Sequence, residues 1–494
     1  MREKKSIFIL YILVFCLTSL IIRADDWLEM QVRLEIQEEA RLRDSLKRLP
    51  PPPAPPKDVE KPVHVMFIFV DHWEPGYGAD ALRKAKIWYD DYGPMARKHV
   101  DADGCHPRHD WFCLYLEKEP LLVLSKAVYD GLGEMDIHIH HGTSNDNDRD
   151  NTMEMKNYVD QYRNYLNKLG ACLTAEENPR VAFGFIHGMW ALDNSRYYID
   201  HYEYCGCNCE IDLLLSKGCY ADFTFPAWGP MEPTLMTSKI FKTRDCNHPK
   251  SYNISTNIKE LALGSPPLPD ELVIFEGPWN STNIDRNEMP TRNRMQSWVD
   301  YNVHVPEKPN WVFVKVYTHS AQNLDSPTGY SNLVGNTADQ FYTDIENYFN
   351  DGINYMLHYC TAREAYNIAV AVADGVTTNG SPNEYRNYKI PPPVNMYYNL
   401  NTFSRLLHRD RTRNESEFML VEALPPTLTI RTKDFTPTVQ VYEKNEGEII
   451  YSPSDAIISS TLTIPVLIED PTPSRFYLLK ENPINSEITN WDNY

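Results

Sequence analysis

The stretch that decides the expected fold is Val63-His-Val-Met-Phe-Ile-Phe-Val70, which is followed at once by Asp71-His72-Trp73-Glu74-Pro75. An apolar run with almost no polar alternation is typical of a strand buried on both faces, as strands are in parallel sheets covered by helices. In such folds the chemistry collects at the carboxyl ends of the strands. The sequence therefore predicts a buried parallel strand over residues 63–70 with a candidate site directly after it.

Beyond this strand, apolar runs alternate with segments of helical periodicity as far as about residue 385. The expected strands are Trp111–Leu116, Met135–His140, Val181–Ile186, Leu272–Phe275, Trp311–Tyr317 and Ile368–Val372. The expected helices are Ala79–Lys98, Pro120–Gly131, Thr152–Leu169, Ile211–Ser216 and Phe341–Leu357. This alternation predicts an α/β fold over residues 62–385, built on a parallel sheet or barrel.

The C-terminal residues 386–494 have a different pattern. Short candidate strands at Thr427–Arg431, Thr438–Tyr442 and Ser460–Leu467 stand between breaks rich in Pro, Asn and Ser. Such short strands separated by turn residues predict a small β-rich C-terminal domain.

The N-terminal residues 1–24 are typical of a targeting segment. Arg2, Lys4 and Lys5 precede an uncharged apolar run from Ser6 to Ile22. The run is short for a spanning helix and long for the apolar part of a signal peptide, so it predicts either a cleaved signal peptide or a single-span signal anchor. In both cases the charged N-terminus stays cytoplasmic. We expect the rest of the chain in the secretory pathway, either membrane-anchored with its C-terminal side outside the cytosol or secreted.

Residues 25–61 join this segment to the globular part. They begin with a charge-rich stretch of helical periodicity and continue into Pro50-Pro-Pro-Pro-Ala-Pro-Pro56, which predicts a stiff polyproline spacer. We expect a helical and proline-rich stalk; a helix that packs on the globular part is the alternative.

Charge and cysteine content narrow the partners and the compartment. The net charge of −20 makes the chain a poor partner for nucleic acid, because phosphate contacts need clustered Lys and Arg. Three of its ten cysteines form Cys205-Gly-Cys207-Asn-Cys209 without a C-x-x-C partner, so disulfides are favoured over a metal site there. Acceptor triplets for N-glycosylation begin at Asn253, Asn280, Asn379 and Asn414.

The strongest indication of chemistry is Glu134-Met-Asp-Ile-His138-Ile-His140-His141-Gly142 at the end of a predicted strand. Residues i and i+2 of a strand face the same way, so His138 and His140 present two imidazoles on one face, about 7 Å apart along the strand, while His141 points away. Neutral imidazole is the commonest metal ligand in proteins. The spacing predicts one divalent metal ion bound by His138 and His140.

Other predicted strands also end in polar residues of catalytic type. These are Asp71, His72 and Glu74 after the first strand, His187, Trp190 and Asp193 after Phe185-Ile186, and His319 after Val314-Lys-Val-Tyr-Thr318. Asp222, in the motif Gly218-Cys-Tyr-Ala-Asp222, is a further candidate. Trp73 and Trp190 are candidates for stacking on a sugar ring or for the core. Because parallel strands end on the same side of a sheet, we expect these residues to lie near the two histidines.

In this order the motifs resemble those of the polysaccharide deacetylases, which belong to a glycoside hydrolase/deacetylase superfamily of incomplete (β/α) barrels. The patterns D-x-x-E, E-x-x-x-H-x-H, G-x-W-x-L-D and G-x-x-x-D and a late strand-end histidine carry the resemblance over residues 62–370. The resemblance implies an incomplete (β/α) barrel. It also implies a metal-dependent hydrolase that removes acetyl groups, with N-acetyl favoured over O-acetyl, from a polysaccharide or glycan outside the cytosol.

The resemblance also implies roles for individual residues. Asp71 is expected as the general base and His319 as the general acid. A divalent metal, usually zinc in that family, is expected on His138, His140 and a third ligand, either His72 or Glu74. His72 stands where the commoner pattern has a second Asp, and Ile186 or His187 stands where it has an arginine. Substrate contacts are expected from Glu74, His187, Trp190 and Asp193.

Two other functions remain open from the sequence. A glycoside hydrolase of the same superfamily would use two carboxylates, such as Asp71 with Asp193 or Asp222. A glycan-binding or cell-surface protein on a barrel without activity would need no metal. Metal content separates this binding protein from the enzymes, and release of acetate rather than reducing ends separates the two enzymes.

The N-terminal segment gives a first prediction. Because positive charges flank the apolar run on its N-terminal side, the globular part should lie outside the cytosol. Protease added to intact cells or sealed vesicles should therefore shave a surface-exposed form or spare a lumenal one. Recovery of the globular part free in the cytosol would contradict this topology.

Overall fold

A computed structural model of the chain describes residues 30–31, 33–41, 59–142, 151–175, 180–199, 204–227, 231–254, 257–279, 282–284, 290–325, 334–377 and 380–393, together with seven strands between residues 405 and 480. The targeting segment 1–24 and the proline run 50–56 lie outside the described residues. None of the helices in the described ranges combines the length and the apolar character needed to cross a membrane.

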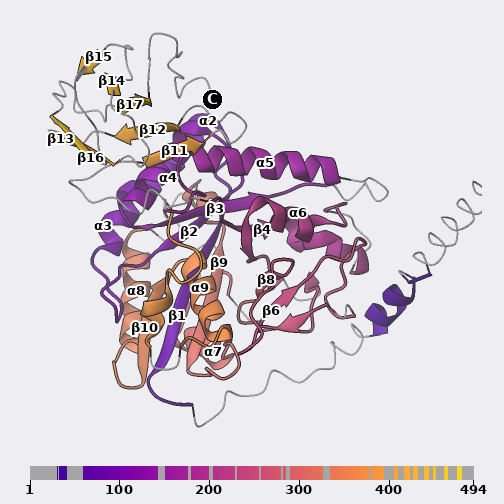
Figure 1. The fold of residues 1–494 in the computed structure, drawn as a ribbon. Helices are drawn as coiled ribbons and strands as arrows, with labels where there is room; N and C mark the ends of the chain where they lie inside the picture. The colour runs from indigo at the N-terminus through magenta and orange to yellow at the C-terminus, as the bar shows by residue number, and fades with distance from the viewer. Residues whose placement is uncertain are drawn as a thin grey trace, which may run out of the picture.

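A ten-stranded, largely parallel sheet forms the centre of the fold (Figure 1). Its order is β10-β1-β2-β3-β4-β5-β8-β6-β7, and β9 also pairs with β1. All pairings are parallel except those of β6 with β7 and with β8. The strands are β1 Val63–Trp73, β2 His109–Cys113, β3 Gly133–Ile139, β4 Phe183–His187, β5 Cys219–Asp222, β6 Ile240–Thr243, β7 Lys259–Glu260, β8 Leu272–Phe275, β9 Trp311–Thr318 and β10 Tyr355–Cys360.

The sheet is barrel-like but not closed. Strand β1 pairs with β9 along residues 64–71, with β10 along 63–68 and with β2 along 70–73. Between β8 and β9 the described residues form no strand pairing; instead an isolated parallel bridge joins Asn283 to Tyr317, and the Ile284 N–H donates to the Tyr317 carbonyl at 2.9 Å. The architecture is thus mixed α/β around a parallel-rich sheet, as the sequence predicted.

Alternation along β1 builds two separate cores. Val65, Phe67 and Phe69 belong to a core shared with the surrounding helices, whereas Met66 and Ile68 belong to a second core on the opposite face. The helices are α2 Gly78–Ile87, α3 Gly93–Ala96, α4 Lys118–Tyr129, α5 Thr152–Lys168, α6 Glu210–Lys217, α7 Arg292–Asp300, α8 Asn336–Phe349 and α9 Ala362–Ala373. Side chains of α9 fill the second core, so this face of the sheet is the interior of the barrel.

Helix α9 lies wholly inside the fold. All of its 12 residues are buried, and it packs against β1, β4, β5 and β10. Thr361 and Glu364 form a capping box that satisfies the first backbone N–H groups of the helix. This helix corrects the predicted strand Ile368–Val372. An apolar run has the same composition in a buried helix and in a buried strand, so periodicity alone does not separate them.

The remaining predicted elements are confirmed with shifted ends, with two further differences. The predicted helix Ala79–Lys98 is divided into α2, a π-helical turn at Trp88–Tyr92 and α3. The predicted helix Phe341–Leu357 ends at Phe349, because Asp351 accepts hydrogen bonds from three following backbone N–H groups and turns the chain into β10. The sequence reading did not predict β5, β6, β7, β10 or α7 as elements.

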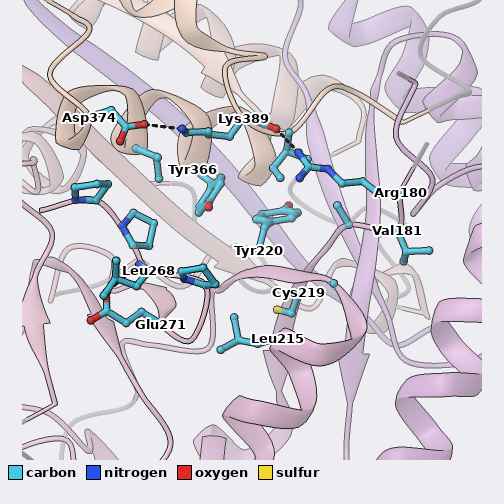
Figure 2. A pocket seen from close by; sticks show the side chains of 17 residues that line it. Arg180, Val181, Leu215, Cys219, Tyr220, Leu268, Glu271, Tyr366, Asp374 and Lys389 are labelled. Carbon is cyan, nitrogen blue, oxygen red and sulfur yellow. Dashed lines mark hydrogen bonds and ion pairs between the residues drawn. The ribbon is translucent and has the colours of Figure 1, made fainter. Parts of the chain in front are cut away.

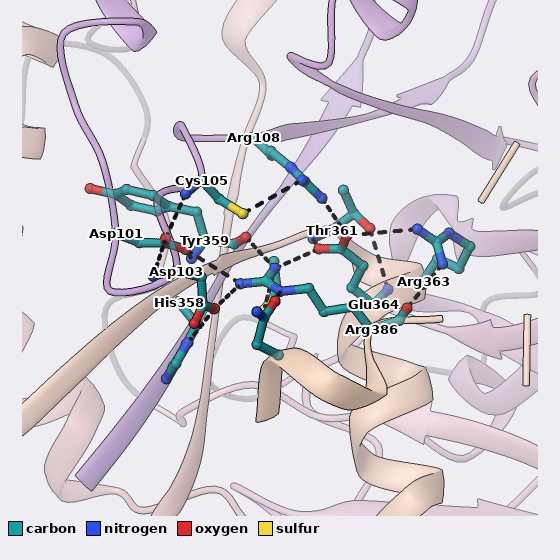
Figure 3. Close-up of polar contacts among 12 residues, drawn as sticks. Asp101, Asp103, Cys105, Arg108, His358, Tyr359, Thr361, Arg363, Glu364 and Arg386 are labelled. Carbon is teal, nitrogen blue, oxygen red and sulfur yellow. Dashed lines mark hydrogen bonds and ion pairs between the residues drawn. The ribbon is translucent and has the colours of Figure 1, made fainter. Parts of the chain in front are cut away.

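Buried ion pairs fasten α9 at the amino-terminal end of the sheet (Figure 3). Arg363 on α9 lies 2.8 Å from Glu134 on β3, and Arg386 lies 2.8 Å from Glu364 and 2.7 Å from Asp103. Burial opposes ionisation of Glu364, but Arg108 and its other arginine neighbours outweigh burial and lower the pKa of Glu364 to about 2. Glu134, which was part of the sequence motif, is therefore a structural partner of α9.

The helical residues 33–41 of the predicted stalk contact the globular part. Tyr198 donates a hydrogen bond to Glu35 at 3.0 Å, and Ser251 and Asn253 donate to Glu39 at 2.9 and 2.6 Å. Glu39 is 1% exposed. This part of residues 25–61 thus packs on the domain, which was the alternative to a free stalk.

Two further features concern the C-terminal side. Residues 386–393, placed with the C-terminal part from the sequence, contact the barrel: Ile390 is buried, and a bridge joins Pro393 to Thr174. Beyond them lie β11 Arg405–Arg409, β12 Glu417–Glu422, β13 Thr427–Arg431, β14 Val439–Glu443, β15 Ile449–Tyr451, β16 Thr461–Pro465 and β17 Arg475–Lys480. They form a five-stranded sheet, β11-β12-β17-β14-β15, and the pair β13-β16, so the three strands predicted here are confirmed.

The buried pairs give a prediction about stability. Glu134→Ala leaves the Arg363 charge buried without its carboxylate and should lower the free energy of unfolding by about 3–5 kcal/mol. Asp270→Ala removes an exposed ion pair with Arg244, which keeps Glu271, and should cost less than about 1 kcal/mol. Urea unfolding at neutral pH, followed by tryptophan fluorescence, measures both. Equal shifts of the two midpoints would show that the buried pair does not hold α9.

Candidate metal centre

A cluster of imidazoles lies at the carboxyl ends of β1, β3 and β9. His72 follows the inward-facing Met66, Ile68 and Val70 of β1, and alternation therefore places His72 on the interior face. By the same rule His138 faces inward from β3. The turn after β1 adds Glu74, the residues after β3 add His140, and the residue after β9 is His319. The structure thus brings together five of the residues that the sequence singled out.

The distances in this cluster are those of side chains that converge on one point. The ring centroids of His72 lie 4.7 Å from His138 and 4.6 Å from His319. The Nε2 atom of His138 lies 3.1 Å from Glu74 Oε1 and 3.1 Å from His140 Nε2. One ligand atom each of His72, Glu74 and His138 lie within 4.8 Å of one another, so these three residues could hold a metal ion.

A backbone contact fixes the tautomer of His138. Its Nδ1 lies 2.9 Å from the Ile186 carbonyl oxygen, which can only accept, so Nδ1 carries the proton. In the neutral ring the Nε2 lone pair then faces the Glu74 carboxylate, which is also an acceptor. A cation between the two atoms resolves this opposition. A metal-bound histidine commonly donates its other ring N–H to a backbone carbonyl in this way.

The electrostatics of the cluster favour neutral imidazoles beside an ionised carboxylate. Burial, followed by the neighbouring His319 and His138, lowers the pKa of His72 well below its ordinary value. Burial also lowers the pKa of His138. For Glu74 burial acts in the opposite direction, but the contacts with the imidazoles of His138 and His140 outweigh it and lower the pKa. These are the protonation states that metal ligands need.

One side of the cluster is open to solvent. The side chain of His138 is fully buried, whereas that of Glu74 is 17% exposed and that of His140 is 39% exposed. His319 is half-buried. A three-ligand set with one accessible side is the arrangement of catalytic zinc sites, which keep a position for water or substrate.

Asp71 lies on the other face of β1. Its carboxylate contacts His109 Nε2 at 2.9 Å and accepts hydrogen bonds from the backbone N–H of Ser320, at 3.0 Å, and from the Ser320 hydroxyl. Asp71 is 0% exposed and packs on the helix side of the sheet. The structure therefore does not bring Asp71 to the imidazole cluster, but it does join Asp71 to the residue that follows His319.

The other predicted site residues also lie away from the open side. His187 and Asp193 are fully buried, in contact with Glu210 on α6. Trp73 is fully buried in the core on the helix side. Trp190 is half-buried and packs against that same core, with a φ of 53°. Among the described residues, none of these four supplies a ligand atom to the group formed by His72, Glu74 and His138.

The structure also assembles a second group that sequence reasoning missed, formed by His141, His187, Cys205 and Glu210. Cys205 was expected in a disulfide, but all nine cysteines that the structure describes are free thiols, and the sulfurs of Cys207 and Cys209 lie 3.9 Å apart. Glu210 stands alone in the sequence after Cys209, and no spacing rule links it to a strand end. Only the folded chain brings it to the histidines.

Glu276 and Lys315 were missed for a different reason. Glu276 directly follows β8, so the strand-end rule applied elsewhere would have found it. Glu276 is buried, and burial raises the pKa of this side chain well above its ordinary value. Lys315 is buried on β9, donates to the Phe223 carbonyl at 2.7 Å and has its pKa lowered by burial to about 8. Charge inside an apolar strand was the available signal for Lys315.

A pocket of about 510 Å³ opens elsewhere on the molecule (Figure 2). Val181, Cys219 and Glu271 line it at the amino-terminal ends of β4, β5 and β8, and Arg180 and Lys389 lie at one side. In barrels of alternating strands and helices the chemistry lies at the opposite, carboxyl-terminal ends. The pocket and the imidazole cluster therefore lie at opposite ends of the sheet.

Comparison with known proteins adds little to this geometry. No protein-family model matches the sequence, and no curated protein matches it. Among solved structures, an α-L-fucosidase GH29 from Bacteroides thetaiotaomicron aligns with 89% of this chain and 100% of that chain, at 11% identity and a TM-score of 0.23. A score this low carries no weight for the fold or the function.

The cluster predicts that metal binding depends on residues at the carboxyl ends of β1 and β3. His138→Gln and Glu74→Gln should each weaken binding of Co²⁺ at this site by about 10-fold or more, because each removes a proposed ligand. Loss of a residue that only hydrogen-bonds to a ligand already lowers metal affinity on the order of 10–100-fold. His64→Gln is the matched control, since His64 lies at the amino-terminal end of β1, 2.9 Å from His358 and away from the cluster. Titration with Co²⁺, followed by visible absorption, measures the affinities. A loss in His64→Gln equal to that in His138→Gln would rule out this assignment.

Proposed function

We propose that the protein is a metal-dependent hydrolase that removes acetyl groups, N-acetyl before O-acetyl, from a polysaccharide or glycan outside the cytosol, on an incomplete barrel of the polysaccharide deacetylase type. The observation that carries this proposal is the set His72, Glu74 and His138. Their ligand atoms lie within 4.8 Å of one another at the carboxyl ends of two parallel strands, on a side that stays accessible through Glu74 and His140.

The proposed metal is zinc. Two imidazoles and one carboxylate form one of the ligand sets of catalytic zinc, and this set leaves room for water and substrate. The sequence left His72 and Glu74 as alternatives for the third ligand, and we assign both, because each lies within reach of the same point as His138. When bound, the ion supplies Lewis-acid polarisation of the substrate carbonyl and of the attacking water.

The chain's own residues then handle the protons. His319 adjoins His72, whereas His140 adjoins His138, so the two remaining imidazoles flank different ligands. We assign His140, which the sequence predicted as a metal ligand, instead as the acceptor of the proton from the attacking water, because the converging ligand atoms are those of His72, Glu74 and His138. We assign His319 as the donor to the leaving nitrogen. An amine is a poor leaving group until it is protonated, and positioned imidazoles are the commonest general acids and bases.

Asp71 has a positioning role in this proposal. Its two carboxylate oxygens hold Ser320, the residue after His319, while the next residue of β1 is the ligand His72. The carboxylate thus fixes the turn that carries the acid relative to the strand that carries a ligand. This replaces the role of general base that the family resemblance suggested for Asp71.

The described contacts favour this reaction over a glycoside hydrolase. A glycosidase needs two carboxyl groups that face each other across the scissile bond. Asp71 faces the helix side of the sheet, Asp193 is fully buried near Glu210, and Asp222 is fully buried against the hydroxyl of Thr224, 2.7 Å away. A non-catalytic protein would have had no need to keep three ligands in reach of one point.

Acetate release from a panel of N- and O-acetylated glycans tests the proposal, with reducing ends measured in parallel. On a substrate so identified, His319→Ala and His140→Ala should each lower kcat by about 10²–10⁴ and change KM only a few-fold, because both act mainly on the transition state. Both variants should keep the metal, whereas His138→Ala should lose metal and activity together. Reducing ends without acetate, or near wild-type turnover by His319→Ala, would contradict the mechanism.

A further inference from the structure

A second cluster of metal-ligating side chains lies on the other face of the sheet. His141 follows β3, His187 ends β4, Cys205 lies in the segment before α6, and Glu210 is the first residue of α6. All four residues are buried, and one ligand atom of each lies within 4.8 Å of the others. His187 faces the same core as Phe183 and Phe185, on the helix side, whereas the open cluster lies in the barrel interior.

The contacts within this group fix one of its imidazoles as an acceptor. His187 Nδ1 lies 2.5 Å from the Gly188 carbonyl oxygen and must donate to it, so in the neutral ring the Nε2 lone pair points into the group. That lone pair faces His141 Nε2 at 3.0 Å and Glu210 Oε1 at 3.4 Å. Cys205 Sγ lies 3.3 Å from the other Glu210 oxygen. A neutral His141 and the Cys205 thiol can donate protons here, and on losing them the two rings, the thiolate and the carboxylate present four ligand atoms within 4.8 Å of one another.

Glu210 has no conventional counter-ion. Among the described residues its ion-pair contacts are the two histidines alone, and no lysine or arginine reaches it. Removing an ionised carboxylate from water costs on the order of several kcal/mol when no cation balances its charge. Its second oxygen accepts from the Asp193 backbone N–H at 2.6 Å, which orients the carboxylate but adds no positive charge.

We propose that His141, His187, Cys205 and Glu210 bind a structural zinc-type ion. Two imidazoles, a thiolate and a carboxylate complete a four-coordinate set, and structural zinc sites are closed in this way. Thiolate and imidazole select zinc over magnesium or calcium, which take oxygen ligands. The backbone contacts of His187 and Glu210 are the second layer of hydrogen bonds that orients such ligands.

This ion ties four segments together behind the open cluster. His140 and His141 are neighbours in sequence but serve opposite faces, so fixing His141 also fixes the backbone of His140. A Cβ atom on Gly188, the residue after His187, would lie 2.4 Å from the His140 ring. The closed site therefore acts as a support for the position of His140.

Cobalt substitution in the full-length chain tests the site, because cobalt bound by a thiolate has a charge-transfer band in the near ultraviolet. The wild-type protein should show this band. Cys205→Ser should lose it together with one equivalent of bound metal, whereas Cys209→Ser, in the same cysteine cluster, should keep both. His138→Gln should also keep the band, so the outcome is independent of the proposed function at the open cluster.

A second arm needs no variant. Cys205 of the wild-type protein should resist alkylation by iodoacetamide until a chelator such as dipicolinate is added, with peptide mass spectrometry as the readout. The inference is overturned if Cys205 reacts equally with and without chelator, if it is found in a disulfide in the native protein, or if cobalt binds without the thiolate band.

Discussion

The alternation of side chains along two buried strands is the constraint on which the rest of this structure depends. Neighbouring residues of a strand face opposite sides of a sheet, so their side chains point alternately into the barrel interior and toward the helices outside it. At the end of β1 this rule sends His72 inward and Asp71 outward. After β3 it sends His140 to the open cluster and His141 to the closed group. One continuous sheet thus separates two sets of ligands that are adjacent in sequence.

The second general theme is the cost of charge inside the protein. At the amino-terminal end of the sheet the buried acids meet arginines, as Glu134 meets Arg363, and the network anchors a helix whose residues are all buried. At the carboxyl-terminal end Glu74 and Glu210 meet imidazoles. The charge of a buried carboxylate is thus balanced in two ways. At the amino-terminal end it is balanced by guanidinium groups of fixed charge, and at the carboxyl-terminal end by imidazoles, which bind protons or metal ions.

Much of the sheet could be predicted from the sequence, because the run 63–70 and the other predicted strands of the sheet are continuous apolar runs of ordinary strand length. Helix α9 could not, since Ile368–Val372 has no polar face to reveal a helical period. Within the candidate site, the pairing of His138 with His140 follows from a spacing of two and is what the structure places together. The position of Asp71 also follows from alternation once His72 is placed inside. Cys205 and Glu210 depend on a loop and a helix start whose positions no local pattern determines.

The contact between the N-terminal helix and the domain has a consequence for covalent chemistry. The side-chain amide of Asn253 has two protons, and it donates one to Glu39 and the other to the carbonyl of Pro233, at 2.6 and 3.0 Å. A sugar attached to this asparagine, which begins an acceptor triplet, would replace one of those protons. Glycosylation of Asn253 and docking of the helix through both of these hydrogen bonds therefore exclude each other. The modification state of Asn253 then shows whether glycosylation or docking of the helix occurred first.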